Sequence, residues 1–411
     1  MVKKNHLDEN INIEGKRVLL RVDFNVPMNN GAITENSRIK KVLPTIKFLI
    51  EKKAKIIIIA HLGRPKGKIV PELTLKPIAE KLSNYLGQNV IFLNESIGPQ
   101  VIEKSKKIPN GKVLLLENLR FFKEEELNSS TFAEKLSKNG DIYVNEAFSC
   151  SHRTHASVCE ITKHINSFAG KQLLKEVDVI KMLTNNAKKP TTCIIGGSKI
   201  STKSGILLNL IKNMQNIVIV GAMANIFIKH EGYNIGKSVF EKNQENLIEN
   251  IIQESKKNNC SLVFPEDVIT SKDYNSKGVT KNLNQINDDD LILDIGKKTL
   301  QSIFKVIDES KTILWNGPVG YFEIDEFSTG SKKIAYKISE NTKNKSLISI
   351  AGGGDTIAAI NKFKCSNGFS YLSTAGGAFL ELLEGKTLPG IKALEINEWI
   401  RKYCKTNGSK R

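Results

Sequence analysis

The sequence predicts an α/β protein made of two doubly wound parallel-sheet (Rossmann-like) domains joined by a hinge helix. The chain has 411 residues, about twice or more what one hydrophobic core usually organises. Short apolar, β-branched runs alternate with amphipathic segments of helical length, as in parallel sheets covered by helices on both faces. Polar or glycine-rich residues directly follow most of these runs, which is where doubly wound sheets bind ligands.

The predicted strands are short runs of mostly Ile, Val and Leu. In the first half of the chain they are Val18–Val22, Ile56–Ala60, Val113–Leu116 and Ile142–Val144. In the second half they are Cys193–Ile195, Ile217–Val220, Leu262–Phe264, Ile313–Trp315, Leu347–Ala351 and Phe369–Leu372. The polar stretch 282–290 is expected to be a surface loop.

A helical repeat separates the two groups of strands. Apolar residues recur at helical spacing from Leu173 to Leu183, and Pro190 ends the pattern. We take 171–189 as an interdomain helix between a first domain, 1–170, and a second domain, 190–389.

Composition narrows the class of protein. No apolar run approaches the roughly 20 residues of a membrane span, and no signal-type stretch follows Met1, so we expect a cytoplasmic protein with no membrane partner. The six Cys are far apart without a Cys-x-x-Cys pair, as reduced thiols would be. The formal charge is +18, but only eight of the 61 basic residues are Arg and the Lys are scattered. Because no basic run is interleaved with aromatic residues, we expect no nucleic-acid partner.

Arginines in the first half stand at or just past the ends of predicted strands. They are Arg21, Arg38, Arg64, Arg120 and Arg153. The carboxyl ends of parallel strands meet at one edge, so these guanidinium groups are expected to converge with His61, Asp23 and Asn25. Paired hydrogen bonds from Arg suit phosphate and carboxylate, and the Asp and Asn can hold hydroxyl groups. This arginine basket predicts a site for a small, highly charged anion such as a phosphorylated sugar acid.

Each arginine alone could instead be a surface salt-bridge partner, and a lone histidine is often structural. We interpret His155 and His164 in that structural way. His61 follows a strand directly and is left open between the two interpretations.

Three glycine-rich turns in the second half predict a nucleotide site. They are Gly196–Lys203, Gly352–Thr356 and Ser373–Gly377. Each follows a predicted strand and opens a helical segment, so backbone N–H groups and a helix N-terminus can meet phosphate. Asp355 adds a carboxylate that can hold Mg²⁺ on nucleotide phosphates. Glycines also serve ligand-free turns, and neither the P-loop nor the dinucleotide fingerprint fits the chain.

Longer strings make the chain resemble the phosphoglycerate kinase family over nearly its whole length. The strings are Arg21–Pro27, His61–Pro65, Glu117–Phe121, Trp315–Glu323, Gly352–Thr356 and Ser373–Gly390, and their order and spacing also match. The resemblance implies a glycolytic enzyme, and in reverse a gluconeogenic one, that reversibly transfers a phosphoryl group from 1,3-bisphosphoglycerate to ADP with Mg²⁺. The products are 3-phosphoglycerate and ATP.

The resemblance also implies roles for individual residues. The substrate residues would be Arg21, Asp23, Phe24, Asn25, Arg38, His61, Leu62, Gly63, Arg64, Arg120 and Arg153. The nucleotide residues would be Lys199, Lys203, Glu323, Gly353, Gly354, Asp355 and Thr356, with Lys199 and Lys203 at the phosphates, Glu323 at the ribose and Asp355 at Mg²⁺. The catalytic residues would be Arg38, Lys203, Gly376 and Gly377.

The family pattern has further implications for organisation. A monomer is expected, the segment 390–411 should return to pack on the first domain, and closure about the interdomain helix should bring the two substrates together. Ser149-Cys150-Ser151 stands where Gly-Thr-Ala is usual, and Ala375 replaces a usual Gly, where a methyl group would resist a positive φ. A kinase for another acid phosphate and a catalytically idle binding protein are the alternatives.

Overall fold

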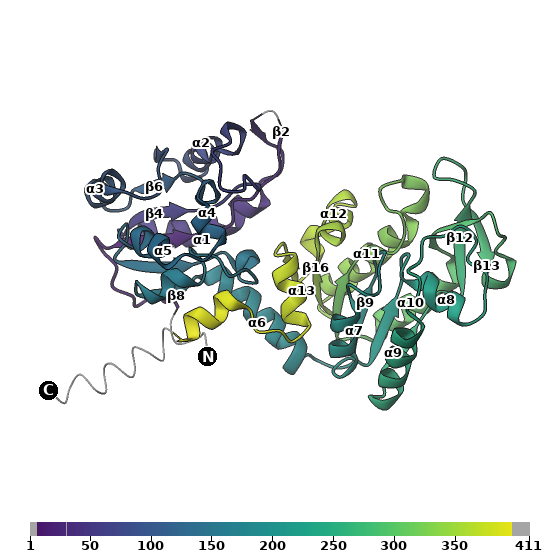
Figure 1. The fold of residues 1–411 in the computed structure, drawn as a ribbon. Coiled ribbons are helices and arrows are strands. Elements are labelled where there is room, and N and C mark those ends of the chain that lie inside the picture. The colour runs from purple at the N-terminus through teal and green to yellow at the C-terminus, as the bar shows by residue number, and fades with distance from the viewer. Residues whose placement is uncertain (1–5, 30, 397–411) are drawn as a thin grey trace. The chain divides into compact units, whose positions relative to one another are not determined.

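The computed structural model describes residues 6–29 and 31–396. The chain forms two compact units, Met1–Asp178 with Thr387–Arg411, and Val179–Lys386. Each unit contains a six-stranded parallel sheet (Figure 1). The predicted fold of two doubly wound α/β sheets is therefore confirmed.

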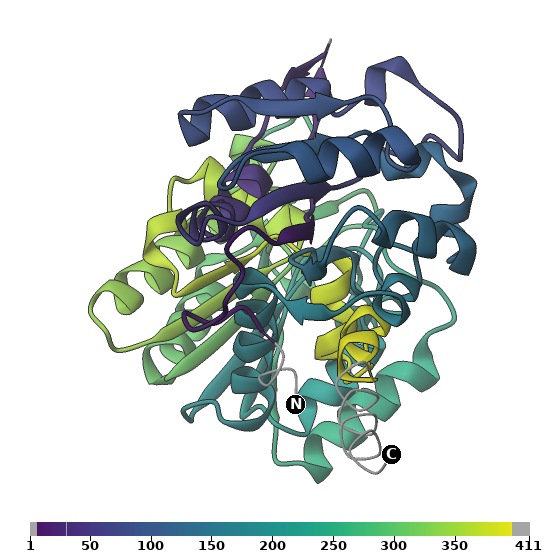
Figure 2. The ribbon, with the colours of Figure 1, turned by 90° about the vertical axis from the view of Figure 1, so that its left-hand side faces the viewer.

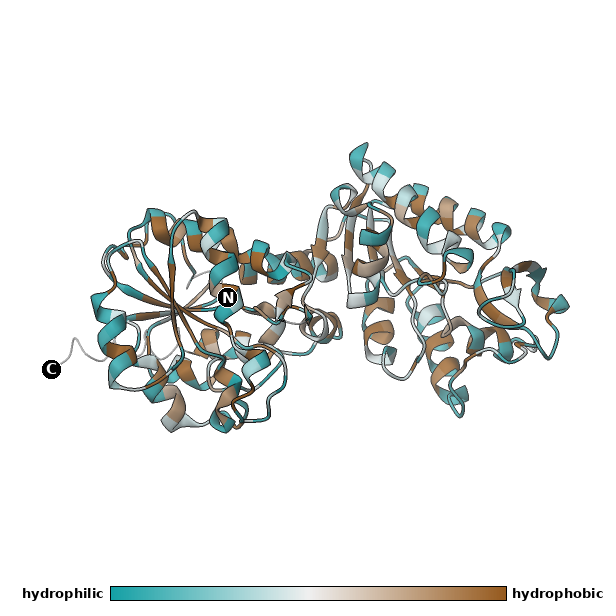
Figure 3. Ribbon diagram, turned by 90° about the horizontal axis from the view of Figure 1, so that it is seen from above, coloured by the Kyte–Doolittle hydropathy of each residue, from teal (hydrophilic) through white to brown (hydrophobic). Residues whose placement is uncertain are grey.

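The sheet of the first unit has the strand order β5-β6-β4-β1-β7-β8. Its strands are β1 (Arg17–Arg21), β4 (Lys55–Ile59), β5 (Val90–Leu93), β6 (Val113–Leu116), β7 (Ile142–Asn145) and β8 (Ser167–Ala169). The helices are α1 (Ser37–Glu51), α2 (Lys76–Leu86), α3 (Pro99–Lys107), α4 (Lys123–Glu126) and α5 (Ser130–Ser137). These helices lie on both sides of the sheet. The strands of the sheet are the most apolar part of the first unit (Figure 3). A short hairpin, β2 (Met28–Asn29) and β3 (Ala32–Ile33), precedes α1.

Burial explains why these segments become central strands. Ile56 to Ile59 in β4 and Val113 to Leu116 in β6 have no exposed surface. Each fully buried aliphatic side chain contributes about 1.5–3 kcal/mol, so a run that is apolar on both faces gains most at the middle of a covered sheet. Helix α1 packs against β4 through Ile39, Ile46 and Leu49, which recur at helical spacing.

The sheet of the second unit has the strand order β11-β10-β9-β15-β16-β17. Its strands are β9 (Thr191–Ile195), β10 (Asn216–Ile219), β11 (Ser261–Val263), β15 (Thr312–Asn316), β16 (Ile348–Gly352) and β17 (Tyr371–Ser373). The helices are α7 (Ser204–Ile211), α8 (Ala224–His230), α9 (Glu245–Lys257), α10 (Lys297–Glu309), α11 (Thr329–Lys343), α12 (Gly354–Lys362) and α13 (Gly377–Leu383).

The second unit also contains a three-stranded antiparallel sheet that the sequence did not predict. Its strands are β12 (Asp267–Ser271), β13 (Val279–Asn282) and β14 (Leu291–Ile295), in the order β13-β12-β14. The stretch 282–290, expected as a surface loop, starts at the end of β13 and ends at a buried carboxylate. Asp290 is 1% exposed, and its buried carboxylate is paired with Lys281 and Lys272 at 2.6 and 2.9 Å.

Helix α6 (Lys171–Asn185) lies within the segment expected to be the interdomain helix. Residues 389–396 are helical and are drawn in yellow in Figures 1 and 2. The N–H of Gly390 donates to the C=O of Ser151 at 2.9 Å. The expected return of 390–411 to the first domain thus concerns partly described residues, and 397–411 lie outside them. Among the described residues, none of the helices has the length and apolarity needed to cross a bilayer.

Candidate active site

Four neighbouring strands of the first sheet deliver the arginine basket. The order β6-β4-β1-β7 places the loops that follow these strands side by side at one edge. Asp23 follows β1, His61 follows β4, Arg120 lies in the 3-10 turn Leu119–Phe121 after β6, and Cys150 ends the 3-10 turn Phe148–Cys150 after β7. Parallel pairing explains why loops far apart in sequence meet here.

Arg21 is buried beneath this edge of the sheet, where its guanidinium group is bonded to neighbouring residues. It is 1% exposed, and its Nε donates to Ser157 Oγ at 2.9 Å while Nη1 donates to the C=O of Val22. Its Nη2 lies 3.1 Å from His61 Nδ1. Because a guanidinium can only donate, Nδ1 must accept, and a neutral His61 then carries its proton on Nε2. Arg21 therefore orients His61 so that an N–H donor remains for a ligand.

The electrostatics of His61 agree with that tautomer. Burial first, and then the charges of Arg21, Arg120 and Arg153, hold the pKa of His61 well below its ordinary value. His61 is thus neutral at physiological pH. His155, expected to be structural, lies in the same environment, because burial and the charges of Arg120, Arg21 and Arg153 lower its pKa to about 3.

Asp23 and Asn25 form a short chain of hydrogen bonds. Asp23 Oδ2 accepts from Arg38 Nη1 and from Ser149 Oγ, while Oδ1 accepts the N–H of Asn25 at 2.9 Å. Asn25 Oδ1 accepts the N–H of Gly63 at 2.9 Å. The chain joins the loops after β1 and β4 to the start of α1, and it fixes the guanidinium of Arg38, which remains partly exposed.

Arg120 has buried donor nitrogens that its neighbours do not satisfy with hydrogen bonds. Its Nη1 donates to the C=O of Gly63 at 2.6 Å, and its side chain is 2% exposed. The buried Nε and Nη2 atoms have no hydrogen-bond partner among the described residues. Nε lies 3.3 Å from Glu126, outside hydrogen-bond geometry. Buried donors of this kind cost free energy unless a ligand satisfies them.

The residues expected to bind the substrate differ in how exposed their side chains are. Arg153 is half-buried and donates through Nε to His152 Nε2 at 3.3 Å. Arg64 is exposed, and it makes no hydrogen bond or ion pair with any residue that the structure describes. Phe24 is fully buried in the core, and Leu62 is 1% exposed with both its backbone groups bonded to Asn118. The side chains of Phe24 and Leu62 therefore support the basket without facing a ligand.

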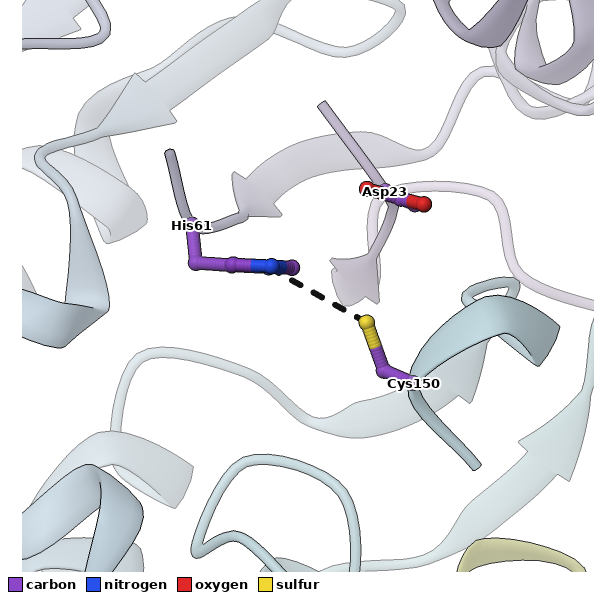
Figure 4. Close-up of side chains that lie close together, drawn as sticks. All are labelled: Asp23, His61 and Cys150. Atoms are coloured by element: carbon purple, nitrogen blue, oxygen red, sulfur yellow. Dashed lines mark hydrogen bonds between the residues drawn. The ribbon is translucent and has the colours of Figure 1, made fainter. Parts of the chain in front are cut away.

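Asp23, His61 and Cys150 converge closely enough to suggest a metal site. One ligand atom from each lies within 4.8 Å of the others, and Figure 4 shows the three side chains approaching from separate loops. The guanidinium of Arg21 already contacts this group, at 3.1 Å from His61 Nδ1 and 3.9 Å from Cys150 Sγ. The positive field that depresses the pKa of His61 also opposes a divalent cation, so we assign the cluster to the anion site.

In the second unit, Lys203 lies among the carbonyl groups of two loops. Its Nζ donates to the C=O of Gly196 and to Asn316 Oδ1, the latter at 2.7 Å. Burial lowers its pKa to about 8, although the charge of Asp355 acts in the opposite direction. Lys203 is thus mostly protonated at pH 7 and lies within electrostatic range of Asp355. Lys199, four residues earlier, is exposed.

The loop after β16 meets the loop after β15. Gly353 has φ of +100°, and a Cβ there would lie 2.7 Å from Asn316 Nδ2, so glycine is required. The N–H of Gly317 donates to Thr356 Oγ1 at 2.7 Å, which fixes the buried Thr356 within the protein. Gly354 and Asp355 are exposed in the first turn of α12, where backbone N–H groups and a carboxylate are available to phosphates and a cation.

The third turn precedes α13. Gly376 has φ of +55° and Gly377 is the exposed first residue of the helix. The positive φ falls on Gly376, and Ala375 is outside that region. The expectation that Ala375 would strain the turn is therefore wrong, because the backbone needs no left-handed residue at that position.

A cavity of about 270 Å³ lies beside these loops. Its walls include Gly197, Ala222, Leu293 and Val319, and the exposed Glu323 and Asp355 also line it. An apolar hollow between a glycine-rich loop and an acidic residue suits a nucleotide.

Sequence reasoning missed two asparagines that organise the loops. Asn118 bonds to both backbone groups of Leu62, and Asn316 bonds to Lys203 and to the C=O of Gly352. Their signal was available, since Asn118 stands two residues after the buried strand β6 and Asn316 ends the buried strand β15. Cys150 and Ser149 were noted only as departures from a family pattern.

Comparisons of the sequence and of the structure with known proteins all match the same family. A family model described as phosphoglycerate kinase matches residues 8–386. The phosphoglycerate kinase of Orientia tsutsugamushi (strain Ikeda) is 47% identical over 386 residues, covering 93% of this chain and 95% of that protein. That of Bartonella bacilliformis is 44% identical over 385 residues, covering 93% and 96%. The solved structure of phosphoglycerate kinase from Coxiella burnetii aligns with a TM-score of 0.86 and 39% identity, covering 94% and 97%.

Proposed function

Since this chain belongs to the phosphoglycerate kinase family and transfers a phosphoryl group between 1,3-bisphosphoglycerate and ADP, we propose that the arginine basket binds the phosphoglycerate. The single observation that carries this assignment is Arg120, whose two buried donor nitrogens, Nε and Nη2, make no hydrogen bond with the described residues, although Nε lies 3.3 Å from Glu126 in an ion pair. A phosphate or carboxylate is the ligand that satisfies such donors best.

Within the basket, the residues take different roles. Arg38, Arg64, Arg120 and Arg153 bind the anionic ends of the substrate, and His61 donates through Nε2. Asp23 and Asn25 receive its hydroxyl group, and Gly63 offers backbone contact. Arg21 acts behind them by orienting His61, because its own donors are bonded within the protein.

The nucleotide binds along the glycine-rich loops of the second unit. Lys203, Lys199 and the backbone of Gly353 and Gly354 contact the phosphates, Glu323 holds the ribose, and the N-terminus of α13 at Gly376 and Gly377 receives the transferring group. Thr356 supports this loop through Gly317. ATP and ADP are substrates of the site.

Asp355 fits a Mg²⁺ ion that accompanies the nucleotide. It is exposed, and its carboxylate makes no hydrogen bond or ion pair with a described residue. One carboxylate together with substrate phosphates is a common Mg²⁺ environment. When bound there, Mg²⁺ would neutralise charge on the nucleotide phosphates.

The chemistry requires alignment more than acid–base catalysis. In the direction that consumes ATP, the nucleophile is a carboxylate that is already ionised at pH 7, so no general base is needed. Arg38 from one unit and Lys203 from the other balance the charge of the transferring group. Because the two substrates bind to different units, we propose that the two units close on each other during turnover. Small-angle scattering with both ligands should then show compaction.

We further propose a cytoplasmic monomer that acts on small molecules without nucleic acid. The scattered Lys residues and the buried, unpaired Cys150, Cys193, Cys260 and Cys365 support this assignment. Light scattering coupled to gel filtration tests the oligomeric state. A steeply salt-sensitive affinity for duplex DNA would contradict the expectation about nucleic acid.

The decisive experiment is MgATP-dependent turnover of 3-phosphoglycerate, coupled to reduction of the acyl phosphate by a dehydrogenase. We expect Arg38→Ala to lower kcat/KM by at least about 100- to 1,000-fold. Arg17→Ala is the matched control, since Arg17 pairs with Asp141 at the opposite end of β1. Absence of turnover in a folded, ATP-binding wild-type protein would favour a different acid-phosphate acceptor.

A further inference from the structure

A fully buried carboxylate, that of Glu125, lies behind the arginine basket. Glu125 belongs to the short helix α4 and has no exposed surface. Both of its carboxylate oxygens accept hydrogen bonds from Ser157: Oε1 accepts the hydroxyl group at 2.6 Å, and Oε2 accepts the N–H at 2.9 Å. The backbone C=O of Glu125 also accepts the N–H of Ala156 at 2.9 Å. These contacts fix the segment that contains Ser157 against α4.

The charge of Glu125 acts on Arg21 through Ser157. His155 Nδ1 lies 3.9 Å from Glu125 Oε1, but the pKa of His155 is about 3, so His155 is neutral at physiological pH. Arg21 donates through Nε to Ser157 Oγ at 2.9 Å. Burial acts to lower the pKa of Arg21, but its surroundings, with Cys150 first and Glu125 next, raise that pKa above its ordinary value. Glu125 therefore stabilises the buried positive charge that contacts His61.

The direction of each hydrogen bond between Glu125 and His61 follows from the groups that make it. The hydroxyl of Ser157 donates its one proton to Glu125, so its oxygen accepts from Arg21 Nε. The guanidinium group is planar and rigid, so fixing Nε also fixes Nη2, which lies 3.1 Å from His61 Nδ1. Glu125 and Ser157 thus determine where Arg21 presents a donor to the imidazole.

We propose that Glu125 and Ser157 are positioning residues for His61, which act through Arg21 to keep the imidazole in the Nε2–H form that donates to phosphoglycerate. This inference rests on the proposed arginine basket. Both residues are fully buried, so they act on the substrate only through His61. Without the Ser157 hydroxyl, Arg21 Nε would be a buried donor with a lost acceptor, and the guanidinium would move to recover one. The imidazole would then exchange between its two neutral tautomers.

The test determines the tautomer of His61 directly. NMR of isotope-labelled imidazole nitrogens in the ligand-free protein distinguishes a protonated from an unprotonated nitrogen, and His61→Gln assigns the signals. The wild type should show a protonated Nε2 and an unprotonated Nδ1. In Glu125→Gln and in Ser157→Ala the two nitrogen signals should move toward each other. The KM for 3-phosphoglycerate should rise by about threefold to tenfold, as for one weakened hydrogen bond, while the KM for ATP stays unchanged.

Glu124→Gln is the matched control, because Glu124 is exposed on the same helix. It should keep the tautomer and both KM values of the wild type. If a folded Glu125→Gln or Ser157→Ala protein keeps a single Nε2–H form, the proposal is overturned, and a raised KM would then reflect structural damage only. Where Glu125→Gln fails to fold, Ser157→Ala, which removes one oxygen atom, gives the same measurement. Failure of the proposed function is distinct, since 3-phosphoglycerate would then leave the His61 signals of the wild type unmoved.

Discussion

Asn316 Oδ1 accepts a hydrogen bond from Lys203 Nζ at 2.7 Å, and its Nδ2 donates to the C=O of Gly352 at 2.7 Å. One amide thus joins the loops that follow β9, β15 and β16. The ammonium group proposed to meet the transferring phosphate is held by a residue that need not touch either substrate.

Replacing Asn316 should therefore impair turnover through Lys203. We expect Asn316→Ala to lower kcat by about tenfold to 100-fold, because a small displacement of an aligned charge is costly. The KM for 3-phosphoglycerate should hardly change, since we propose that this substrate binds to the other unit. Asn316→Asp should raise the pKa of Lys203 and move the alkaline limb of the pH profile upward. A normal kcat in Asn316→Ala would show that Lys203 needs no such support.

Lys203 itself should control the alkaline limb. Its pKa of about 8 means that the free enzyme loses this charge as the pH rises through 8. Affinity for ATP should fall above that pH, because protonated Lys203 is the form that attracts phosphate. Lys203→Ala should lose about 100- to 1,000-fold in kcat and lose the limb as well. Lys212→Ala serves as the control, since Lys212 is an exposed lysine just after α7 with no proposed role. Retained turnover in Lys203→Ala would remove Lys203 from the mechanism.

His61 should produce no inflection near its ordinary pKa. Burial and three neighbouring arginines keep it neutral, so the kcat/KM for 3-phosphoglycerate should not change between pH 6 and 7.5 on account of His61. The pKa of His61 is lower in the folded protein than in the unfolded chain. Neutral His61 therefore contributes to the free energy of unfolding above pH 6.5, and this contribution is lost as the pH falls through the pKa of His61 in the folded protein. NMR titration of the imidazole provides the measurement. A midpoint near 6.5 in the free enzyme would contradict the neutral, donor-ready state.

Glu146 should be important for the stability of the first unit. It is 2% exposed, and its carboxylate accepts the hydroxyl of Thr45 and the N–H groups of Gln172 and Leu173 at the start of α6. Glu146→Ala removes the acceptor for these buried donors, and the free energy of unfolding should fall by about 2–4 kcal/mol. Urea denaturation measures the loss. Thr45→Val should cost about 1 kcal/mol, and an equal or larger cost than Glu146→Ala would contradict this account.

The central strands could be predicted because their burial is uniform. Ile56 to Ile59 form an unbroken apolar run, which only a strand covered on both faces explains well. Of the antiparallel strands, β13 was missed because it is polar and largely exposed. Thr280 and Lys281, for example, alternate between exposed and half-buried positions, so the run shows no sustained apolar pattern. Strands β12 and β14 are mostly buried, but the acidic residues Asp267 and Asp294 interrupt their short apolar runs.

For the candidate site, the sequence allowed the location of the residues to be predicted, but not the direction or the contacts of their side chains. The arginines could be placed at one edge because parallel strands end together there. Nothing in the sequence indicated that Arg21 would use its donors internally or that Phe24 would be fully buried. Such outcomes depend on which neighbour is nearest in space, as with Ser157 for Arg21, and that neighbour is 136 residues away in the chain.

The arginine basket is assembled by folding, before any substrate arrives. Arg21 is already fixed, and Arg120 keeps two buried nitrogens that make no hydrogen bond with the described residues. The free first unit must therefore tolerate closely spaced like charges, and any small multivalent anion that enters the basket will relieve them. By linkage, the melting temperature should depend on the anion in the solution. A sample kept in phosphate or sulfate and one kept in chloride would thus differ in shelf life and in apparent substrate affinity, although the polypeptide is the same.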